Sequence, residues 1–237
     1  MIREAIRIGS RDPISLGMYV LLGKDNALNY QLYELVKWLK FETKDIKEYL
    51  SLLSHSQKFH DSIKEQIKGI NYGQIAFPEL LYVLVRLVKP LTVVETGVSA
   101  GISSAYILQA LDDNQRGRLY SIDYPNYAIQ EAEKVVQTGF AVPTYLRHRW
   151  SLMEGKSADV LPTLNRNLDS INIFIHDSEH SYDNMKFEYE EVWDNISYGG
   201  LLISHDINDN KAFREFALKW KHEYKEVYFT GLGVIIK

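Results

Sequence analysis

The stretch Val93–Ser104 reads V-V-E-T-G-V-S-A-G-I-S-S and carries more information than any other part of the chain. The apolar residues before Glu95 predict a buried strand, and the residues after Gly101 predict a helix. Gly97 allows a sharp turn between the two, and Gly101 allows the helix to sit close to a ligand and to the strand. The first turn of a helix offers unbonded N–H groups that suit a carboxylate or a phosphate. This stretch therefore predicts a small-ligand site at the end of a strand.

The spacing of the two glycines separates this turn from the turn of dinucleotide-binding proteins. Those proteins prefer G-x-G-x-x-G, whereas this chain has E-x-G-x-x-x-G with Ser99 where the second glycine would stand. A glycine-rich turn without a ligand remains an alternative at this point, because a fold alone does not fix a function.

The composition favours one large α/β domain with an appendage. The chain has 237 residues, of which 46% are hydrophobic and 24% are charged. The net charge of −4 argues against a general binder of nucleic acids or of anionic membranes. Because the chain has no cysteine, disulfides, thiolate metal sites and a cysteine nucleophile are excluded.

No targeting or membrane segment is expected from the sequence. No apolar run approaches the roughly 20 residues that cross a bilayer. Residues 1–10 alternate charged with apolar residues and lack the core of a signal peptide. We therefore expect a cytoplasmic protein.

Residues 1–70 are expected to form a helical N-terminal extension. Apolar residues recur at helical spacing over 28–40, and the segments 43–53 and 60–68 are further amphipathic candidates. Three roles are open for this extension: a lid over the site, a dimerisation surface that forms a homo-oligomer, or a packing appendage. Its aromatic residues fit either an acceptor pocket or ordinary core packing.

Residues 71–237 are expected to form the main domain, in which strands alternate with helices. The expected strands cover 91–95, 118–123, 144–152, 171–175, 201–204, 225–229 and 234–237. The expected helices cover 77–88, 102–111, 128–138, 158–164, 183–196 and 211–221. This alternation implies a mainly parallel sheet, and the short connection between the last two strands implies an antiparallel hairpin. The predicted fold is a Rossmann-like α/β fold with seven strands and an antiparallel last strand.

Polar side chains stand at the ends of four predicted strands. They are Glu95, Asp123, Asp177 and the pair His205 and Asp206. Ligands of doubly wound sheets lie across these carboxyl ends. Several carboxylates on one rim repel each other unless a cation or hydrogen-bond donors join them, which favours a site over coincidence. An acid in the place of Asp123 can accept both hydroxyls of a ribose, although a solvated loop aspartate is the alternative.

Two serines extend this predicted site. Ser103 lies in the first turn of the helix that follows the first strand, where a hydroxyl can donate to a ligand carboxylate. Ser157 follows the third strand within Gly155-Lys156-Ser157, which could frame the edge of an adenine ring. Ordinary roles at helix N-termini are the alternatives for both residues.

The second informative stretch is F-I-H-D-S-E-H-S-Y at Phe174–Tyr182. Asp177 and Asp206 follow different strands and could share a hard divalent cation such as Mg²⁺. Such a cation would lower the pKa of a substrate hydroxyl. His180 is a suitable base because imidazole titrates near neutral pH. The competing interpretation is that these residues hydrogen-bond loop backbones.

Together these motifs resemble the class I S-adenosylmethionine-dependent methyltransferases, over about residues 70–237. The greatest similarity is to the metal-assisted O-methyltransferases of the catechol and macrolide-sugar groups. The resemblance implies S-adenosylmethionine as cofactor and identifies a set of cofactor-binding residues: Gln74, Glu95, Gly97, Gly101, Ser103, Asp123, Ser157 and Asp177. Within this set, Ser103 would hold the methionine carboxylate and Asp123 the ribose.

The resemblance also implies a catalytic and a metal-binding set. Asp177-Ser178-Glu179-His180 is similar to the D-x-x-H of the sugar O-methyltransferases, which makes His180 the base and Asp177 a catalytic metal ligand. His205 and Asp206 resemble the family's acidic pair, with His205 where a carboxylate is usual. The implied metal ligands are Asp177, His205 and Asp206, for Mg²⁺ or Mn²⁺. A histidine ligand shifts the preference toward ions softer than Mg²⁺.

The leading hypothesis is therefore methyl transfer from S-adenosylmethionine to a hydroxyl of a small molecule, with assistance from a divalent cation. Methylation of nitrogen or carbon without a metal is one alternative. An NAD-linked oxidoreductase is another, and a non-catalytic methyltransferase-like binding module is a third. Neither a nucleic acid nor a membrane is expected as a partner.

Overall fold

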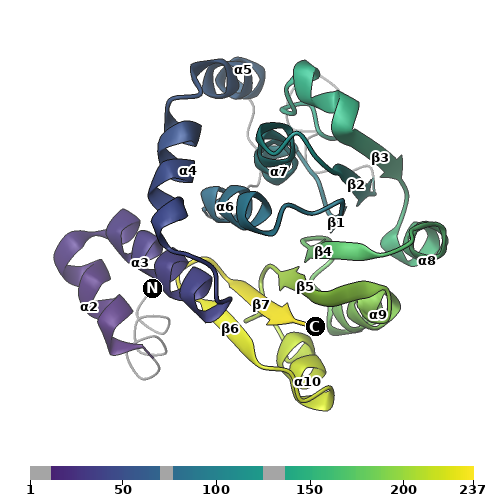
Figure 1. The fold of residues 1–237 in the computed structure, drawn as a ribbon. Helices are drawn as coiled ribbons and strands as arrows, with labels where there is room; N and C mark the ends of the chain where they lie inside the picture. Colours follow the sequence, from purple (N-terminus) through teal and green to yellow (C-terminus); the bar gives the residue numbers. More distant parts are fainter. Residues whose placement is uncertain (1–11, 70–76, 125–136) are drawn as a thin grey trace.

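The structure, a computed structural model, describes residues 12–69, 77–124 and 137–237 and is built around one seven-stranded sheet (Figure 1). The strand order is β3-β2-β1-β4-β5-β7-β6. The strands are β1 (Thr92–Thr96), β2 (Arg118–Asp123), β3 (Trp150–Glu154), β4 (Ile171–His176), β5 (Ile196–Ser204), β6 (Tyr224–Val227) and β7 (Leu232–Ile236). β7 pairs antiparallel with β5 and β6, and the other pairs are parallel. The predicted Rossmann-like sheet with an antiparallel last strand is confirmed.

Helices cover both faces of the sheet (Figure 1). One face carries α6 (Glu79–Val88) and α7 (Ile102–Asp113), and the other carries α8 (Ser157–Asn167), α9 (Tyr182–Trp193) and α10 (Ala212–Lys219). Side chains alternate between the faces, so Val93 packs in the core under α6 and α7 while Val94 packs in the core under α8 to α10. Both residues are fully buried. A strand covered on both faces has to be apolar along its length, as β1 is before Glu95.

The N-terminal helices are α2 (Pro13–Leu22), α3 (Lys24–Trp38), α4 (Lys44–Ser54) and α5 (Gln57–Ile67). They begin beside the sheet edge formed by β6, where α3 lies, and continue past α6 to α7, beside which α5 lies (Figure 1). Leu35 of α3 and Phe59 of α5 are fully buried in the same core as α6 and α7, and the Phe59 ring meets Tyr106 edge to face at 5.0 Å. The region is therefore helical where it is described, as predicted. The boundary near residue 70 remains a prediction.

Helix α2 was not predicted, although its start has a clear signal. Asp12 accepts a hydrogen bond from the Ser15 backbone N–H at 3.0 Å, and Pro13 occupies the first helical position. Both features stabilise the beginning of a helix. No helix in the described parts of the chain is both long and apolar enough to cross a membrane.

Two predicted boundaries in the sheet are wrong by more than two residues. Residues 144–149 form a 3₁₀-helix rather than the first half of a strand, and pairing with β2 begins only at Trp150. Pro143 precedes that turn, and Arg147 donates to the carbonyls of Gly139 and Val142, which holds the chain in the turn. The predicted helix over 128–138 lies almost entirely outside the described residues.

The second error concerns the start of β5, which was predicted at Leu201. Helix α9 ends at Trp193, and β5 begins at Ile196 and pairs with Ile171. The Asn195 side chain donates to the Asn165 and Leu168 carbonyls and so fixes the chain between helix and strand. Gly199 and Gly200, which fall between the predicted helix 183–196 and the predicted strand 201–204, lie within β5, beside a bulge in its pairing with β4.

Candidate active site

The sheet has its topological switch point between β1 and β4, where the chain crosses in opposite directions. The turn after β1 and the loop after β4 meet there. The Asp177 N–H donates to the Thr96 carbonyl at 2.8 Å. Gly97 has φ +85°, and a Cβ atom on it would lie 2.0 Å from the Asp177 carbonyl oxygen. Gly97 is therefore required because the ends of the two strands pack against each other.

Gly101 is required by a different contact. It has φ +89°, and a Cβ atom on it would lie 2.8 Å from Gly139 Cα and from Val142 Cγ2. The neighbouring Ala141 N–H donates to the Ala100 carbonyl at 2.8 Å, which holds the segment in place. Gly101 thus lets the helix start approach the segment 139–142, and it is not among the residues that line the cavity described below.

Glu95 is fully buried beneath the turn. It accepts hydrogen bonds from the hydroxyls of Ser103 and Ser104 at 2.6 Å each and of Ser121 at 2.9 Å. Burial raises the pKa of Glu95 to about 7, against the lowering effect of these three hydrogen bonds. The Ser103 hydroxyl predicted to hold a ligand carboxylate thus donates to Glu95 in this structure. Backbone N–H groups of the same first turn still suit an anion.

A cavity of about 560 Å³ opens at the carboxyl ends of β1, β2, β4 and β5. This volume lies in the usual range for small-molecule sites. The residues that line it are Gly97, Val98, Ser99, Ile102, Ser103, Ile122, Asp123, Tyr124, Gly155, Lys156, Ser157, Ala158, Asp177, Ser178, Glu179, His180, Asn184, His205 and Asp206. The structure therefore brings Gly97, Ser103, Asp123, Ser157 and the predicted catalytic and metal-binding residues to one cavity.

Asp123 ends β2 at the wall of this cavity. Its carboxylate accepts the Ser99 N–H at 3.3 Å, and burial raises its pKa although backbone hydrogen bonds from Val98 and Ser99 lower it. Beyond Asp123 the wall continues through Tyr124, whose ring lies 5.7 Å from the Lys156 ammonium. The sequence interpretation did not include Tyr124, although its place directly after Asp123 could have indicated it.

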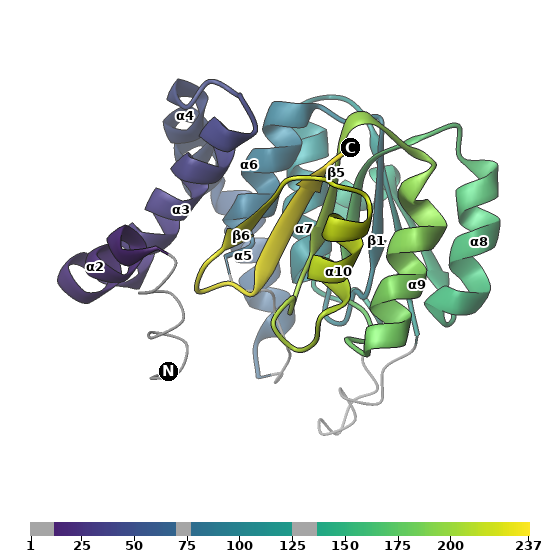
Figure 2. The ribbon, with the colours of Figure 1, turned by 90° about the horizontal axis from the view of Figure 1, so that it is seen from below.

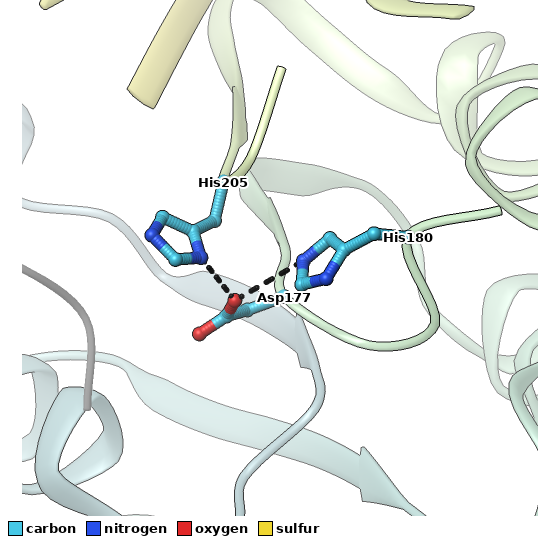
Figure 3. A group of neighbouring side chains, drawn as sticks. All are labelled: Asp177, His180 and His205. Carbon is cyan, nitrogen blue, oxygen red and sulfur yellow. Dashed lines mark hydrogen bonds and ion pairs between the residues drawn. The ribbon is translucent and has the colours of Figure 1, made fainter. Parts of the chain in front are cut away.

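Asp177, His180 and His205 form one side of the cavity, called here the Asp–His cluster (Figure 3). Nδ1 of His205 lies 2.7 Å from Oδ1 of Asp177, and Nε2 of His180 lies 3.4 Å from the same oxygen. Oδ2 of Asp206 lies 3.5 Å from His205 Nδ1 and 3.7 Å from His180 Nδ1. All four predicted residues therefore come together, with Asp177 between the two imidazoles.

The charges of the cluster reinforce one another. Burial acts to raise the pKa of Asp177, but hydrogen bonds and charge from His180 and His205 outweigh it and leave this pKa below its ordinary value. Burial acts to lower the pKa of each histidine, but Asp177 and Asp206 outweigh it and leave both pKa values raised. A carboxylate beside two imidazoles of raised pKa is an arrangement suited to proton transfer.

Comparison with known proteins places this geometry in a family. Residues 94–207, which include every residue that lines the cavity, match the family model of a methyltransferase domain. The chain carries a methyltransferase domain. The predicted class of enzyme is confirmed. No protein of curated function matches the chain significantly.

Solved structures share the fold of this methyltransferase domain. The O-methyltransferase TomG from Streptomyces achromogenes, in complex with S-adenosylmethionine, has a TM-score of 0.55 and 15% identity, over 80% of this chain and 95% of TomG. The O-methyltransferase from Bacillus cereus, in complex with S-adenosylhomocysteine, has a TM-score of 0.57 and 12% identity, over 81% and 100%. A methyltransferase from Geobacter sulfurreducens has a TM-score of 0.55 and 18% identity, over 82% and 96%.

The methyltransferase domain contains two overlapping groups of residues that could hold a cation. Asp177, His180 and His205 each offer one ligand atom, all within 4.8 Å of one another, and so do His180, Asp206 and Asp209. A carboxylate with imidazoles fits a divalent transition ion better than it fits Mg²⁺, which prefers oxygen ligands. The residues present therefore fit a metal, although neither group is the predicted set of Asp177, His205 and Asp206, and the first group has His180 in place of Asp206.

One predicted residue lies outside the described part of the chain, and further residues that line the cavity were not predicted. Gln74, predicted to contact the cofactor, lies outside the described residues. Ser178 and Asn184 line the cavity of the methyltransferase domain but were not predicted. Asn184 lies in the first turn of α9, and no motif in the sequence marks it.

Proposed function

We propose that the protein transfers the methyl group of S-adenosylmethionine to a hydroxyl oxygen of a small molecule. The observation that carries this proposal is the single cavity that joins the β1 turn, Asp123 and the Asp–His cluster within a methyltransferase domain. A binding module would need the first two features only. The cluster adds a base and a group of ligands for a cation at the far wall.

The cofactor would lie along the carboxyl ends of β1, β2 and β3. Its methionine carboxylate would meet the first turn of α7 near Ser103, and its ribose hydroxyls would meet Asp123. Its adenine would lie toward Ser157, between the segments that follow β2 and β3. Solved structures with the same fold hold S-adenosylmethionine or S-adenosylhomocysteine, which supports this cofactor.

The protein's own part in the reaction would be alignment, exclusion of water and removal of a proton. The sulfonium already activates the methyl group, so the acceptor oxygen has to be held in line with methyl carbon and sulfur. His180 is the proposed base, and Asp177 would hold its ring and stabilise the imidazolium that forms. Asp177 and Asp206 raise the pKa of His180 against the effect of burial, which makes its imidazole a stronger base.

A divalent cation would be held by Asp177, His205 and Asp206. When bound, it would lower the pKa of the acceptor hydroxyl and fix its oxygen. If His180 is the third ligand in place of Asp206, as its distance to Asp177 allows, it cannot also act as the base. The choice between these two roles of His180 decides whether the metal or the imidazole activates the acceptor.

Isothermal titration calorimetry with S-adenosylhomocysteine tests the cofactor, and Asp123→Ala tests its placement. We expect the substitution to weaken binding by at least tenfold, since a ribose would lose a charged acceptor. Asp194→Ala is the matched control because Asp194 is exposed and follows α9, at the opposite end of the sheet. Absence of wild-type binding at millimolar concentrations would contradict the proposal.

Transfer of a labelled methyl group from S-adenosylmethionine identifies the acceptor. Phenols, catechols, sugars and amines form a suitable panel, and mass spectrometry of the product distinguishes a methylated oxygen from a methylated nitrogen or carbon. Labelling confined to amines would contradict O-methylation and leave the cofactor assignment intact.

We further propose that the protein forms a homo-oligomer through α2. This helix exposes a run of apolar side chains, with Val20 70%, Leu21 81% and Leu22 58% exposed. Helix α2 lies on the outer side of the N-terminal helices, away from the sheet (Figure 2). A second copy would bury these side chains, and adjacent exposed apolar residues of this kind mark interaction surfaces.

A further inference from the structure

Glu188 is a buried carboxylate of α9 that lies behind the proposed site. Its side chain is fully buried, and each of its two oxygens accepts hydrogen bonds. Oε2 accepts from Thr96 Oγ1 at 2.5 Å and from His176 Nδ1 at 2.6 Å. Oε1 accepts from Ser178 Oγ at 2.6 Å and from Asn184 Nδ2 at 3.2 Å. A buried charge is tolerated only with such partners, so the four donors and the acid form one unit.

The hydrogen-bond donors around Glu188 stabilise its ionised form. Burial alone would raise the pKa of Glu188, but the hydrogen bond and charge of His176, with hydrogen bonds from Ser157 and Ser178, leave this pKa below its ordinary value. A carboxylate only accepts hydrogen bonds, so His176 donates through Nδ1 and its ring orientation is fixed.

Two of the donors flank Asp177 directly. His176 precedes it and Ser178 follows it, and both are bonded to the same carboxylate. A third donor, Thr96, precedes Gly97 and accepts the Asp177 N–H through its carbonyl at 2.8 Å. Glu188 therefore ties together the end of β1, the end of β4 and the backbone on both sides of Asp177.

The fourth donor, Asn184, extends the network to the cofactor side of the cavity. Its Nδ2 also donates to the Glu179 carbonyl at 2.9 Å, and its Oδ1 accepts from Ser157 Oγ at 3.2 Å. Ser157, Ser178 and Asn184 all line the cavity. The network thus joins the loop that carries His180 to the segment where adenine would lie.

His176 gives the network a contact with His180. The two imidazole rings meet edge to face, with centroids 5.4 Å apart. Because Glu188 fixes the His176 ring, that ring forms a fixed wall against which His180 packs. The His180 loop is held at its other end as well, since Asn210 Nδ2 donates to the His180 carbonyl at 2.9 Å.

We propose that Glu188 is a positioning residue of the methyltransferase site, whose carboxylate holds the segment 176–184 and the β1 turn in the geometry that the cavity requires. Its four hydrogen bonds set the backbone around Asp177, the packing of His180 and, through Asn184, the place of Ser157. The expected effect on cofactor binding rests on the proposed function, whereas the expected effect on the order of the segment 176–184 does not.

The test compares Glu188→Gln with Val192→Ala. Glutamine has the same shape but only one acceptor oxygen, so it cannot satisfy donors on both sides. Val192 lies one turn further along α9, is fully buried in the apolar core and has no side-chain hydrogen-bonding group, so it serves as a matched destabilising control. Glu190→Gln makes the same chemical change on the same helix at the Lys219 ion pair, which is partly exposed.

Two measurements are made on each variant. Hydrogen–deuterium exchange, followed by mass spectrometry, reports the protection of residues 174–185. Calorimetry with S-adenosylhomocysteine reports cofactor affinity. For Glu188→Gln we expect exchange at least tenfold faster in this segment and at least tenfold weaker binding. Neither quantity should change more than twofold in Glu190→Gln, or in Val192→Ala at a similar loss of melting temperature.

The outcomes separate a positioning role from a structural one. If Glu188→Gln and Val192→Ala change exchange and affinity equally at equal stability, the proposal is overturned. If Glu188→Gln does not fold, Asn184→Ala replaces it, because it removes the link from Oε1 to Ser157 and to the Glu179 carbonyl, and the same two effects are expected. If the wild-type protein does not bind S-adenosylhomocysteine, the proposed function fails, and the exchange measurement still decides the role of Glu188.

Discussion

Nδ1 of His205 donates a hydrogen bond to Oδ1 of Asp177 across 2.7 Å and so joins the end of β5 to the residue that follows β4. The backbones agree with this pairing, because the His205 N–H donates to the His176 carbonyl at 2.9 Å. Two side chains from strands far apart in the sequence are thus held by the register of the sheet. The Asp–His cluster is organised by the protein itself, as preorganised sites require.

The pH dependence of stability should reveal this pair. The lowered pKa of Asp177 contributes stability that is present above its ordinary pKa of 3.8 and is lost as pH falls through the lowered value. The raised pKa of His205 contributes stability that is present below 6.5 and is lost as pH rises through the raised value. The free energy of unfolding lost in Asp177→Asn should therefore be largest between about pH 4 and pH 6.5.

Urea unfolding at half-unit steps of pH, without added metal, measures this difference. A hydrogen bond between charged groups of this exposure is worth about 2 kcal/mol, and Asp177→Asn should lose about that amount within the window. Asp194→Asn should show no window, because that carboxylate is exposed. A loss that is the same from pH 4 to pH 9 would contradict the charge pairing.

Glu95 predicts a second dependence of stability on pH, opposite in sign to that of Asp177. Its folded-state pKa of about 7 lies above the ordinary 4.5, so the folded protein binds the proton more tightly and loses stability as pH rises between these values. At 1.36 kcal/mol per pKa unit, this loss is at most about 3 kcal/mol. Glu95→Gln should remove the dependence, since an amide does not ionise and the three serine hydroxyls can rotate. Denaturant unfolding at pH 5 and pH 8 measures how much of the free energy of unfolding each protein loses between these pH values. An equal loss in the wild type and in Glu95→Gln would rule out the raised pKa.

Gly97→Ala should damage both the fold and the site. Its Cβ atom would lie 2.0 Å from the Asp177 carbonyl oxygen, at a φ of +85° that alanine rarely adopts. We expect a loss of more than about 3 kcal/mol in the free energy of unfolding, together with loss of S-adenosylhomocysteine binding. Gly17→Ala is the matched control, because Gly17 lies within α2 and nothing lies within 4 Å of its added Cβ. There we expect a gain of about 0.5–1 kcal/mol. Equal melting temperatures for the two variants would show that β1 and β4 tolerate separation.

The sequence predicted the part of the site that depends only on strand ends. Parallel strands end at one edge of the sheet, so Asp123, Asp177 and His205 had to lie near one another once the strands were assigned. The strand-to-helix turn between Glu95 and Gly101 was predicted, but the burial of Glu95 beneath three serine hydroxyls was not, and neither Glu95 nor Gly101 lines the cavity. The sequence around β1 does not show which neighbouring residue makes each glycine necessary. For Gly97 that neighbour is the backbone of Asp177.

The remaining features depend on packing across elements. Residues 144–149 have a strand-like composition, yet Pro143 and the Arg147 hydrogen bonds hold them in a 3₁₀-helix. Glu188 looks in the sequence like any acid on an amphipathic helix. Its importance comes from four donors that are 4 to 92 residues away along the chain, and no local pattern announces such a network.

The mixed ligand set predicts a preference among metals. Two imidazoles beside Asp177 should make Mn²⁺ bind at least tenfold more tightly than Mg²⁺. Calorimetry on the wild type and on His205→Ala measures both affinities, with His148→Ala as the control at an exposed histidine. His205→Ala should reduce Mn²⁺ binding at least tenfold and leave the weaker Mg²⁺ binding nearly unchanged. Equal affinities of the wild type for the two ions would argue that oxygen ligands alone hold the cation.

His180→Asn separates the two roles proposed for His180. If His180 is a ligand, Mn²⁺ affinity should fall by about as much as it does in His205→Ala. If His180 is the base, Mn²⁺ affinity should be retained while methyl transfer to the acceptor found in the panel falls by about 100-fold or more. Both groups of side chains that could hold a cation include His180, and its Nε2 lies 3.4 Å from Asp177 Oδ1, so the geometry allows either role.

The exposed apolar run of α2 predicts a concentration-dependent assembly. Leu21 is 81% exposed, so Leu21→Glu should not disturb the fold of a single chain, but it would place a charge inside a contact between two copies. We expect the dissociation constant of the oligomer to rise at least tenfold, which sedimentation equilibrium measures directly. Leu218→Glu is the matched control, because Leu218 is 71% exposed on α10 and lies apart from α2 (Figure 1). If the wild-type protein has the mass of one chain at all concentrations, α2 does not mediate self-association. If Leu218→Glu dissociates the oligomer and Leu21→Glu does not, the contact lies on α10 instead.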